Sequence, residues 1–272
     1  MTVLSSARPE STTSAAPAGT GNAEAMNSVL GKARLIIEAF TAEDDALSLA
    51  ELVRRTGVAK ASVHRLAQEL LGWGVLERAG NRYRLGLRLF EIGQRVPRQR
   101  ILREAALPYM EDLLLATQET VHFAIHDGLE VLYVEKLMVH RGVSKQSRVA
   151  GRLPLFCTAT GKVILAFSAP ALFHEVLRRG LTPLTHRTVT QPGLLRAQLD
   201  RIRAESLAVE VEETRLGYTS VAVPVFGDTG ALAGALSITA PTFRLNHANH
   251  GRFTVALRTA ALGVSRALQA TG

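Results

Sequence analysis

Cysteine is almost missing from this sequence of 272 residues, since Cys157 is the only one. A single thiol excludes a disulfide within the chain and any zinc or iron–sulfur site built from several cysteines. The sequence also has no apolar run near the roughly 18 residues that a membrane-spanning helix requires. Its beginning lacks the basic and then apolar pattern of a signal peptide, so we expect a cytoplasmic protein with no membrane partner.

The common signatures of nucleotide-binding and hydrolytic enzymes are missing as well. Gly161 and Lys162 do not form a phosphate-binding loop, because Val163 follows them and Phe156 stands where the first glycine belongs. No dinucleotide-binding glycine pattern, nucleophile elbow or zinc-protease motif occurs. These absences disfavour an enzyme.

Two weaker arrangements of reactive residues remain. Cys157 could act as a nucleophile with His174 or His186 as its base, but a lone cysteine is more often simply buried. His122 and His126 are four residues apart, but no carboxylate cluster accompanies them, as a metal site would need. We therefore expect no catalytic residue, no metal and no cofactor.

Positive charge is distributed unevenly along the chain. The formal net charge is +8, and residues 26–103 hold 14 Lys and Arg against 8 Asp and Glu. A basic segment beside a nearly neutral one is typical of a nucleic-acid-binding domain joined to another domain. Arginine outnumbers lysine 27 to 5, which GC-rich codon usage also produces, so charge alone favours DNA only slightly.

The chain divides into four segments by composition and periodicity. Residues 1–25 are rich in Ser, Thr, Ala and Pro and predict a disordered tail. Residues 26–86 predict a helix, a short helix, a glycine turn, a third helix and a hairpin, the order of a winged helix-turn-helix. Residues 87–102 predict a linker helix, with a joint near Pro97. Residues 103–272 predict an antiparallel sheet covered by helices, so the fold class is α+β with two domains.

The third helix, expected to begin near Lys60 and to end at Gly72, carries residues that suit DNA. Its apolar residues fall on one side of a helical wheel and leave a small, polar and basic outer face, as a helix in the major groove requires. The alternative is an ordinary solvated helix, which the glycine turn and the basic hairpin disfavour. The candidate DNA-binding residues of this helix and the hairpin are Lys60, Ser62, His64, Arg65, Gln68, Arg78, Arg82 and Arg84.

The linker segment has wide apolar coverage for a short helix, with Leu87, Leu89, Phe90, Ile92 and Val96. A linker helix with too much apolar surface often pairs with a copy of itself, which predicts a homodimer. The alternative is that this helix packs on its own domain.

Residues 153–162, which read LPLFCTATGK, do not look like plain core. A rigid proline leads into small and hydroxyl residues just before an apolar helix, and the N-terminus of a helix offers free N–H groups to an anion. The alternative is an ordinary helix start with Thr158 or Thr160 as the cap, and the residue pattern leaves both interpretations open.

Ordered motifs in both halves of the chain carry a resemblance to one family. They are TGVAKASVHRL at residues 56–66, the wing and linker at 82–86 and 90–93, and residues 153–162, 209–213 and 220–241. With them the chain resembles the IclR family of bacterial transcriptional regulators.

The resemblance implies an N-terminal winged helix joined by the linker to a GAF-like α/β effector-binding domain. It implies dimers or dimers of dimers that repress or activate operons, often for the catabolism of aromatic or small organic acids. The expected partners are double-stranded operator DNA, palindromic for a dimer, and a small organic-acid-like effector. The effector-binding positions carried over by motif are Ala159, Thr160, Glu210, Ser220, Ser237 and Thr239.

Three residues depart from the family's pattern. Phe156 stands where His is common, which would make the rear wall of the pocket more apolar. Ala59 stands where a proline often opens the DNA-reading helix. Glu210 stands where Asp is frequent, and its charge opposes a carboxylate ligand unless nearby N–H groups or Lys162 balance it.

Overall fold

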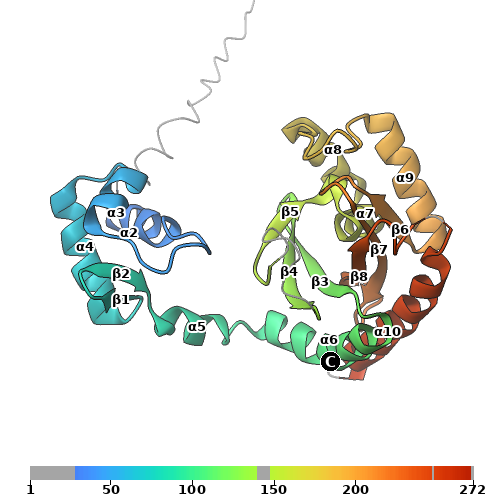
Figure 1. Cartoon of the computed structure of the whole chain (residues 1–272), viewed down its shortest axis with the longest axis horizontal. Helices are drawn as coiled ribbons and strands as arrows, with labels where there is room; N and C mark the ends of the chain where they lie inside the picture. Colours follow the sequence, from blue (N-terminus) through green and yellow to red (C-terminus); the bar gives the residue numbers. More distant parts are fainter. Residues whose placement is uncertain (1–27, 140–147, 247, 271–272) are drawn as a thin grey trace, which may run out of the picture. The chain divides into compact units, whose positions relative to one another are not determined.

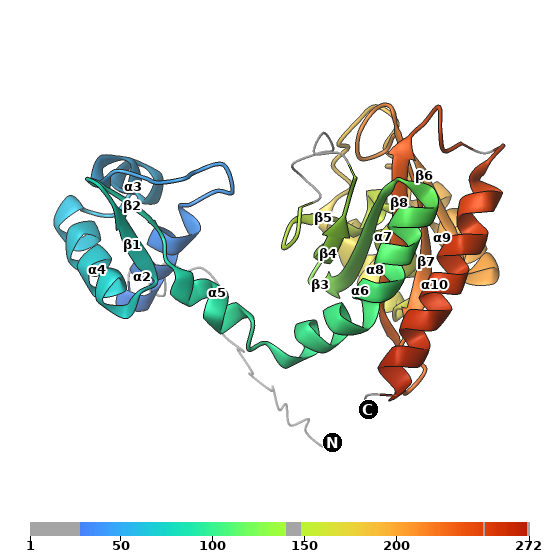
Figure 2. The same cartoon turned by 60° about the horizontal axis from the view of Figure 1, so that its bottom comes forward.

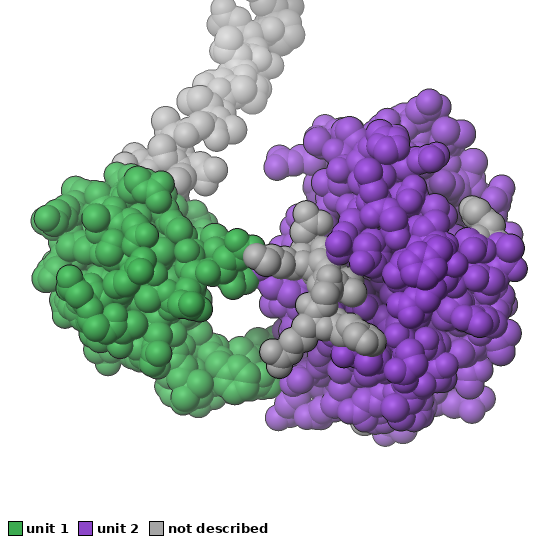
Figure 3. Space-filling model, in the orientation of Figure 1, with its two compact units in different colours: residues 1–96 green, residues 97–272 purple. Residues whose placement is uncertain are grey.

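The computed structural model describes residues 28–139, 148–246 and 248–270 (Figure 1). The chain divides into two compact units, residues 1–96 and 97–272 (Figure 3). This division falls inside the predicted linker and at the predicted joint, Pro97. The tail predicted for residues 1–25 lies outside the described residues. Within the described ranges, no helix has both the length and the apolar character needed to cross a membrane.

The first unit is three helices followed by a two-stranded hairpin and a short helix. Its elements are α2 (Val29–Glu38), α3 (Leu49–Thr56), α4 (Lys60–Trp73), β1 (Leu76–Ala79), β2 (Arg82–Leu85) and α5 (Leu87–Gly93). The antiparallel strands are joined by a turn at Gly80 and Asn81, as the sequence predicts. A shared core of residues from all three helices and the hairpin holds the unit together.

Short-range chemistry sets the ends of these helices. Ser48 Oγ accepts a hydrogen bond from Glu51 N, and the Glu51 carboxylate accepts one from Ser48 N, so a capping box begins α3. Gly57 ends α3 in the left-handed region, with φ of 67°. Helix α4 ends at Trp73, one residue beyond the predicted end, because the left-handed cap is Gly74.

The second unit is built around one antiparallel sheet of six strands in the order β5-β4-β3-β8-β7-β6. The strands are β3 (Thr120–Asp127), β4 (Glu130–Leu137), β5 (Arg152–Pro154), β6 (Ala208–Val211), β7 (Tyr218–Phe226) and β8 (Leu232–Pro241). The helices are α6 (Pro97–Thr117), η2 (Leu155–Cys157), α7 (Ala159–Phe167), α8 (Pro170–Arg179), α9 (Pro192–Glu205) and α10 (His250–Ala270). The predicted antiparallel sheet with covering helices is confirmed.

Helices cover both faces of the sheet. Figure 2 shows α6 and α10 on one face, and α7 with α8 and α9 on the other. Alternation along β3 sends Val121 and Phe123 into the core under α6 and α10, and Ala124 into the core under α7. His122 lies on the α7 side with Ala124 and opposite Ser237 of β8. Alternate residues of the central strands therefore face α7.

Two prolines shape the chain as their backbones require. The linker predicted as one helix over residues 87–102 is instead two helices, because α5 ends at Gly93 and α6 begins at Pro97. A proline disfavours helix in the residue before it but suits the first position of a new helix. The last residue of β7 that pairs with β6 is Ala222, opposite Ala208, and Pro224 comes after it. Pro224 therefore lies where β7 pairs with β8 alone, the kind of edge position that a proline tolerates in a sheet.

Candidate DNA-binding surface and ligand pocket

Helix α4 is amphipathic in the way that its sequence predicts. Val63, Leu66, Ala67 and Leu70 are buried against the other helices. The opposite side is open to solvent, and Ser62 between the two sides is half-buried. The exposed residues among the DNA-binding candidates are Lys60, His64, Arg65, Gln68, Arg78, Arg82 and Arg84.

Three of the candidate arginines already hold a carboxylate in this structure. The pairs are Arg65–Glu69 at 2.5 Å, Arg82–Glu51 at 2.9 Å and Arg84–Glu77 at 2.8 Å. Exposed ion pairs of this kind contribute about 0–1 kcal/mol, so a phosphate group can replace the carboxylate. The Arg82 pair also ties the hairpin to the capping box of α3. The Arg82–Glu51 pair joins residues 31 positions apart, so the sequence alone does not reveal it.

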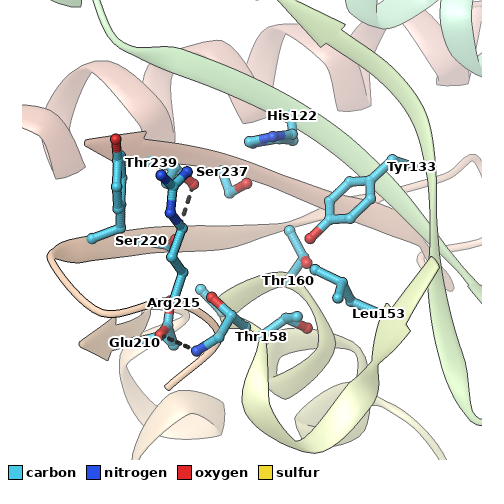
Figure 4. Close-up of a pocket in the computed structure, with 13 residues that line it drawn as sticks. His122, Tyr133, Leu153, Thr158, Thr160, Glu210, Arg215, Ser220, Ser237 and Thr239 are labelled. Atoms are coloured by element: carbon cyan, nitrogen blue, oxygen red, sulfur yellow. Dashed lines mark hydrogen bonds between the residues drawn. The ribbon is translucent and has the colours of Figure 1, made fainter. Parts of the chain in front are cut away.

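A cavity of about 40 Å³ lies on the α7 face of the sheet in the second unit (Figure 4). It is lined by His122, Tyr133, Leu153, Thr158, Ala159, Thr160, Glu210, Thr214, Arg215, Tyr218, Ser220, Ser237 and Thr239. The structure therefore brings all six predicted effector positions to one cavity. Its space suits a few water molecules, since one water needs about 10–15 Å³, and a larger ligand must displace side chains.

The start of α7 forms one wall of this cavity. Thr158 is the cap, because its Oγ1 accepts a hydrogen bond of 2.9 Å from Gly161 N. Thr160 is not the cap, and its buried hydroxyl has no hydrogen-bond partner among the described residues. Gly161 packs so closely that a Cβ atom there would lie 2.2 Å from the carbonyl oxygen of Leu155. The glycine thus lets the first turn of α7 sit against the preceding segment.

Glu210 is buried in the wall opposite α7, with 1% of its surface exposed. Its Oε1 accepts hydrogen bonds from the backbone N–H groups of Glu213 and Thr214. Burial raises the pKa of the Glu210 carboxyl to about 7, and the two N–H groups act in the opposite direction. Of the two ways to balance the Glu210 charge that the sequence offers, N–H groups or Lys162, the structure therefore shows the N–H groups.

Lys162 pairs with a different carboxylate. Its Nζ donates to Glu213 in an ion pair whose side chains are 1% and 5% exposed. Glu213 Oε2 also accepts from Val189 N at 3.1 Å, and Thr188 Oγ1 donates to the Glu213 carbonyl at 2.7 Å. Glu213 therefore connects α7, the turn between β6 and β7, and the segment before α9.

Unpartnered polar atoms gather at the cavity. Among the described residues, four buried side-chain nitrogen or oxygen atoms lack a hydrogen-bond partner. Three of them line this cavity: His122 Nε2, Thr160 Oγ1 and Arg215 NH1. Burial lowers the pKa of His122 to about 3, so its imidazole is neutral. Such atoms usually find a partner in a bound molecule or water, and the cavity is where one would sit.

Several residues of this pocket are not evident from the sequence. Arg215 belongs to a charged turn that resembles a solvated loop, but its guanidinium carbon lies 4.3 Å from the centre of the Tyr218 ring, inside the cavity wall. His122, which the sequence indicates as a partly exposed strand residue more than as a metal ligand, is instead buried in the cavity wall, with 2% of its surface exposed. Because side chains alternate along a strand, His122 lies on the same face of β3 as Ala124, and that face is covered by α7.

The alternative chemistry is not supported by the geometry. Cys157 is fully buried, and burial raises the pKa of its thiol to about 12, so the reactive thiolate is scarce at neutral pH. Among the described residues, no group of three or more His, Cys, Asp or Glu side chains could hold a metal. The expected role of Phe156 as the rear wall is wrong. Its place in η2 directs it to a separate depression lined by Pro154 and Val176.

A basic winged-helix unit in the same chain as a sheet domain with a buried polar pocket defines a DNA-binding regulator that carries a ligand-binding domain. Residues 94–266 match the family described as bacterial transcriptional regulator IclR, C-terminal, and residues 29–80 match the IclR helix-turn-helix domain. The chain belongs to the IclR family, and it is a DNA-binding transcriptional regulator.

Individual relatives agree with this assignment. The HTH-type transcriptional regulator XynR of Escherichia coli K12 is 30% identical over 240 residues, 87% of this chain and 95% of that protein. The regulator KdgR of the same organism is 31% identical over 226 residues, 82% and 86% of the two chains. A crystal structure of an IclR homologue from Microbacterium hydrocarbonoxydans, complexed with 4-hydroxybenzoate, superposes with a TM-score of 0.83. It is 31% identical and covers 89% of this chain and 100% of that one.

Proposed function

We propose that this regulator binds a small organic acid in the α7-face cavity and that the bound acid changes its affinity for operator DNA. The observation that carries the proposal is the convergence of three unpartnered buried polar atoms on one cavity beside the N-terminus of α7. The N–H groups of a helix N-terminus favour an anion. The 4-hydroxybenzoate complex of the Microbacterium homologue supports the same ligand class.

The proposed DNA contacts lie on α4 and the hairpin. Lys60 and Arg65 suit phosphates, and Ser62 suits either a phosphate or a base edge. His64 and Gln68 suit base edges in the major groove. Arg78, Arg82 and Arg84 on the hairpin suit phosphates or the minor groove, once the carboxylates of Glu51 and Glu77 are displaced. These eight residues are a proposal drawn from exposure, charge and position.

We also propose that the chain forms a homodimer and that two such dimers can assemble into a tetramer. Leu89 packs on the core of its own unit, but Leu87 and Phe90 of α5 are 64% and 62% exposed. Large apolar side chains left open on a short helix suit pairing with a second copy. A two-fold dimer would read a palindromic operator.

The proposed coupling runs from the cavity to the linker. The acid closes the pocket, the strain passes through α5 and the start of α6, and the spacing of the two winged helices changes. Binding free energies are reciprocal, so operator DNA must change the affinity for the acid by the same factor.

A thermal-shift panel of aromatic and aliphatic acids tests the site, followed by operator binding with and without each acid that binds. A ligand at 100 times its dissociation constant adds about 2.7 kcal/mol of stability. Thr160→Val should abolish the shift, and Thr259→Val, on an exposed part of α10, should retain it. A shift unaffected by Thr160→Val, or operator binding that ignores every bound acid, would overturn the proposal.

A further inference from the structure

We propose that Arg215 is the residue that selects an acid over a neutral molecule in this pocket, with its guanidinium receiving the carboxylate. The inference rests on the proposed function and names the specificity-determining side chain. Arg215 lies in the turn between β6 and β7, and Figure 4 shows its side chain extending from the Glu210 side of the cavity toward Ser220 and Thr239.

Of the described side chains that line the cavity, Arg215 is the one with a positive charge that can receive a carboxylate. It is the only Lys or Arg among the described residues that line the cavity. Lys162 lies behind the wall and is committed to Glu213. Glu210 Oε1 accepts hydrogen bonds from two backbone N–H groups of its own turn. Among the described residues, an anion that enters the cavity therefore meets one side-chain cation, Arg215.

The Arg215 side chain is held by stacking and leaves hydrogen-bonding capacity unused. Its guanidinium stacks on Tyr218, and its buried NH1 has no hydrogen-bond partner within the described part of the chain. A guanidinium presents five N–H donors in a planar fork that matches the two oxygens of a carboxylate. A charge-assisted, bidentate pair in a site shielded from water is stronger than stacking on a ring. A carboxylate supplies the partner that Arg215 lacks here.

The other end of the cavity is neutral. Tyr133 and Thr160 lie across the cavity from Arg215 in Figure 4, with His122 above them. Their hydroxyl groups and the neutral imidazole suit a hydroxyl or carbonyl group, and the described residues that line the cavity include no second Lys or Arg for a second carboxylate. The geometry therefore favours a monocarboxylate with an uncharged polar group over a dicarboxylate.

Matched pairs of acids and amides test this assignment. The probes are 4-hydroxybenzoate with 4-hydroxybenzamide, benzoate with benzamide, and lactate with lactamide, titrated by calorimetry into the full-length protein. For at least one pair, the native protein should bind the acid at least tenfold more tightly than the amide. Arg215→Gln should weaken acid binding at least tenfold and leave amide binding within threefold. Arg215→Lys should keep part of the preference.

Arg187→Gln is the matched control, because Arg187 lies near the same turn, is paired with Glu212 at 3.7 Å, and does not line the cavity. It should leave both affinities unchanged, and the thermal unfolding of each ligand-free variant confirms that it folds. Acids that bind Arg215→Gln as tightly as the native protein, or amides that match their acids, would overturn the role of Arg215. The proposed pocket would survive that result if Thr160→Val still abolished binding. No binding by any probe would overturn both proposals.

Discussion

Replacing Lys162 by Met removes the cation of a buried ion pair and leaves Glu213 without it. The two side chains are 1% and 5% exposed, so water cannot take the place of the lost partner. Breaking a buried pair in this way costs about 3–5 kcal/mol. Glu213 keeps its hydrogen bond from Val189 N, which favours the lower end, about 3 kcal/mol. A domain of this size then loses about 6–12 °C in melting temperature.

The assay can follow the two units separately. The one tryptophan, Trp73, lies in the first unit, so its fluorescence reports the winged helix while circular dichroism follows both units. Lys162→Met should lower the melting temperature of the second unit, which circular dichroism follows. It should leave the melting temperature of the first unit, reported by Trp73 fluorescence, unchanged. Arg152→Met is the control, because Arg152 and Asp127 are 44% and 50% exposed and their pair should contribute about 0–1 kcal/mol.

The single variant Glu213→Gln and the double variant Lys162→Met/Glu213→Gln complete the cycle. Removing the stranded charge should recover at least about 1 kcal/mol relative to Lys162→Met alone. A cost for Lys162→Met no greater than for Arg152→Met, or no recovery in the double variant, would refute the view that this pair holds the turn to α7.

Three further changes test other parts of the structure. The raised pKa of Glu210 means that its contribution to stability is complete below about pH 4.5 and is lost as the pH rises through about 7. Native stability should thus fall relative to Glu210→Gln by up to about 3 kcal/mol between pH 4.5 and 8, and a constant difference in urea midpoints would contradict this. Gly161→Ala forces a Cβ atom against Leu155 and should cost about 1–3 kcal/mol or more, whereas Gly193→Ala, with open space around it, should be neutral or stabilising. Arg65→Ala should weaken binding to all DNA sequences and lower the salt dependence by about one phosphate contact in anisotropy titrations. A loss confined to one base position would exclude that phosphate role.

Local features of the fold could be predicted from the sequence because short-range chemistry determines them. Ser48 begins α3 and Gly57 ends it, since the cap and the left-handed turn depend on residues within one helical turn. The choice between Thr158 and Thr160 could not be made in this way. Both have a hydroxyl at a suitable spacing, and the path of the preceding chain decides which one caps α7.

The candidate site was only partly predictable because distant strands assemble it. Motif resemblance gave six of its positions, but Arg215 reaches the cavity only when the turn after β6 folds over the sheet. Lys162 could pair with Glu210 or Glu213, three residues apart, and only the tertiary packing distinguishes them. The linker was predicted as one helix although Pro97 lies inside it, and the proline begins a new helix instead.

The pairing of Arg65, Arg82 and Arg84 with glutamates bears on how a regulator finds its operator within a chromosome. A genome presents about 10⁶ or more competing stretches of DNA, all with the same phosphates. In the proposed contacts each internal carboxylate is exchanged for a phosphate, so the gain from binding any DNA is reduced. The base-edge contact proposed for His64 bears no such cost. Operator and bulk DNA present the same phosphates, so this cost falls on both, and the built-in glutamates shorten the time spent on every site while the base contacts alone set the ratio between them.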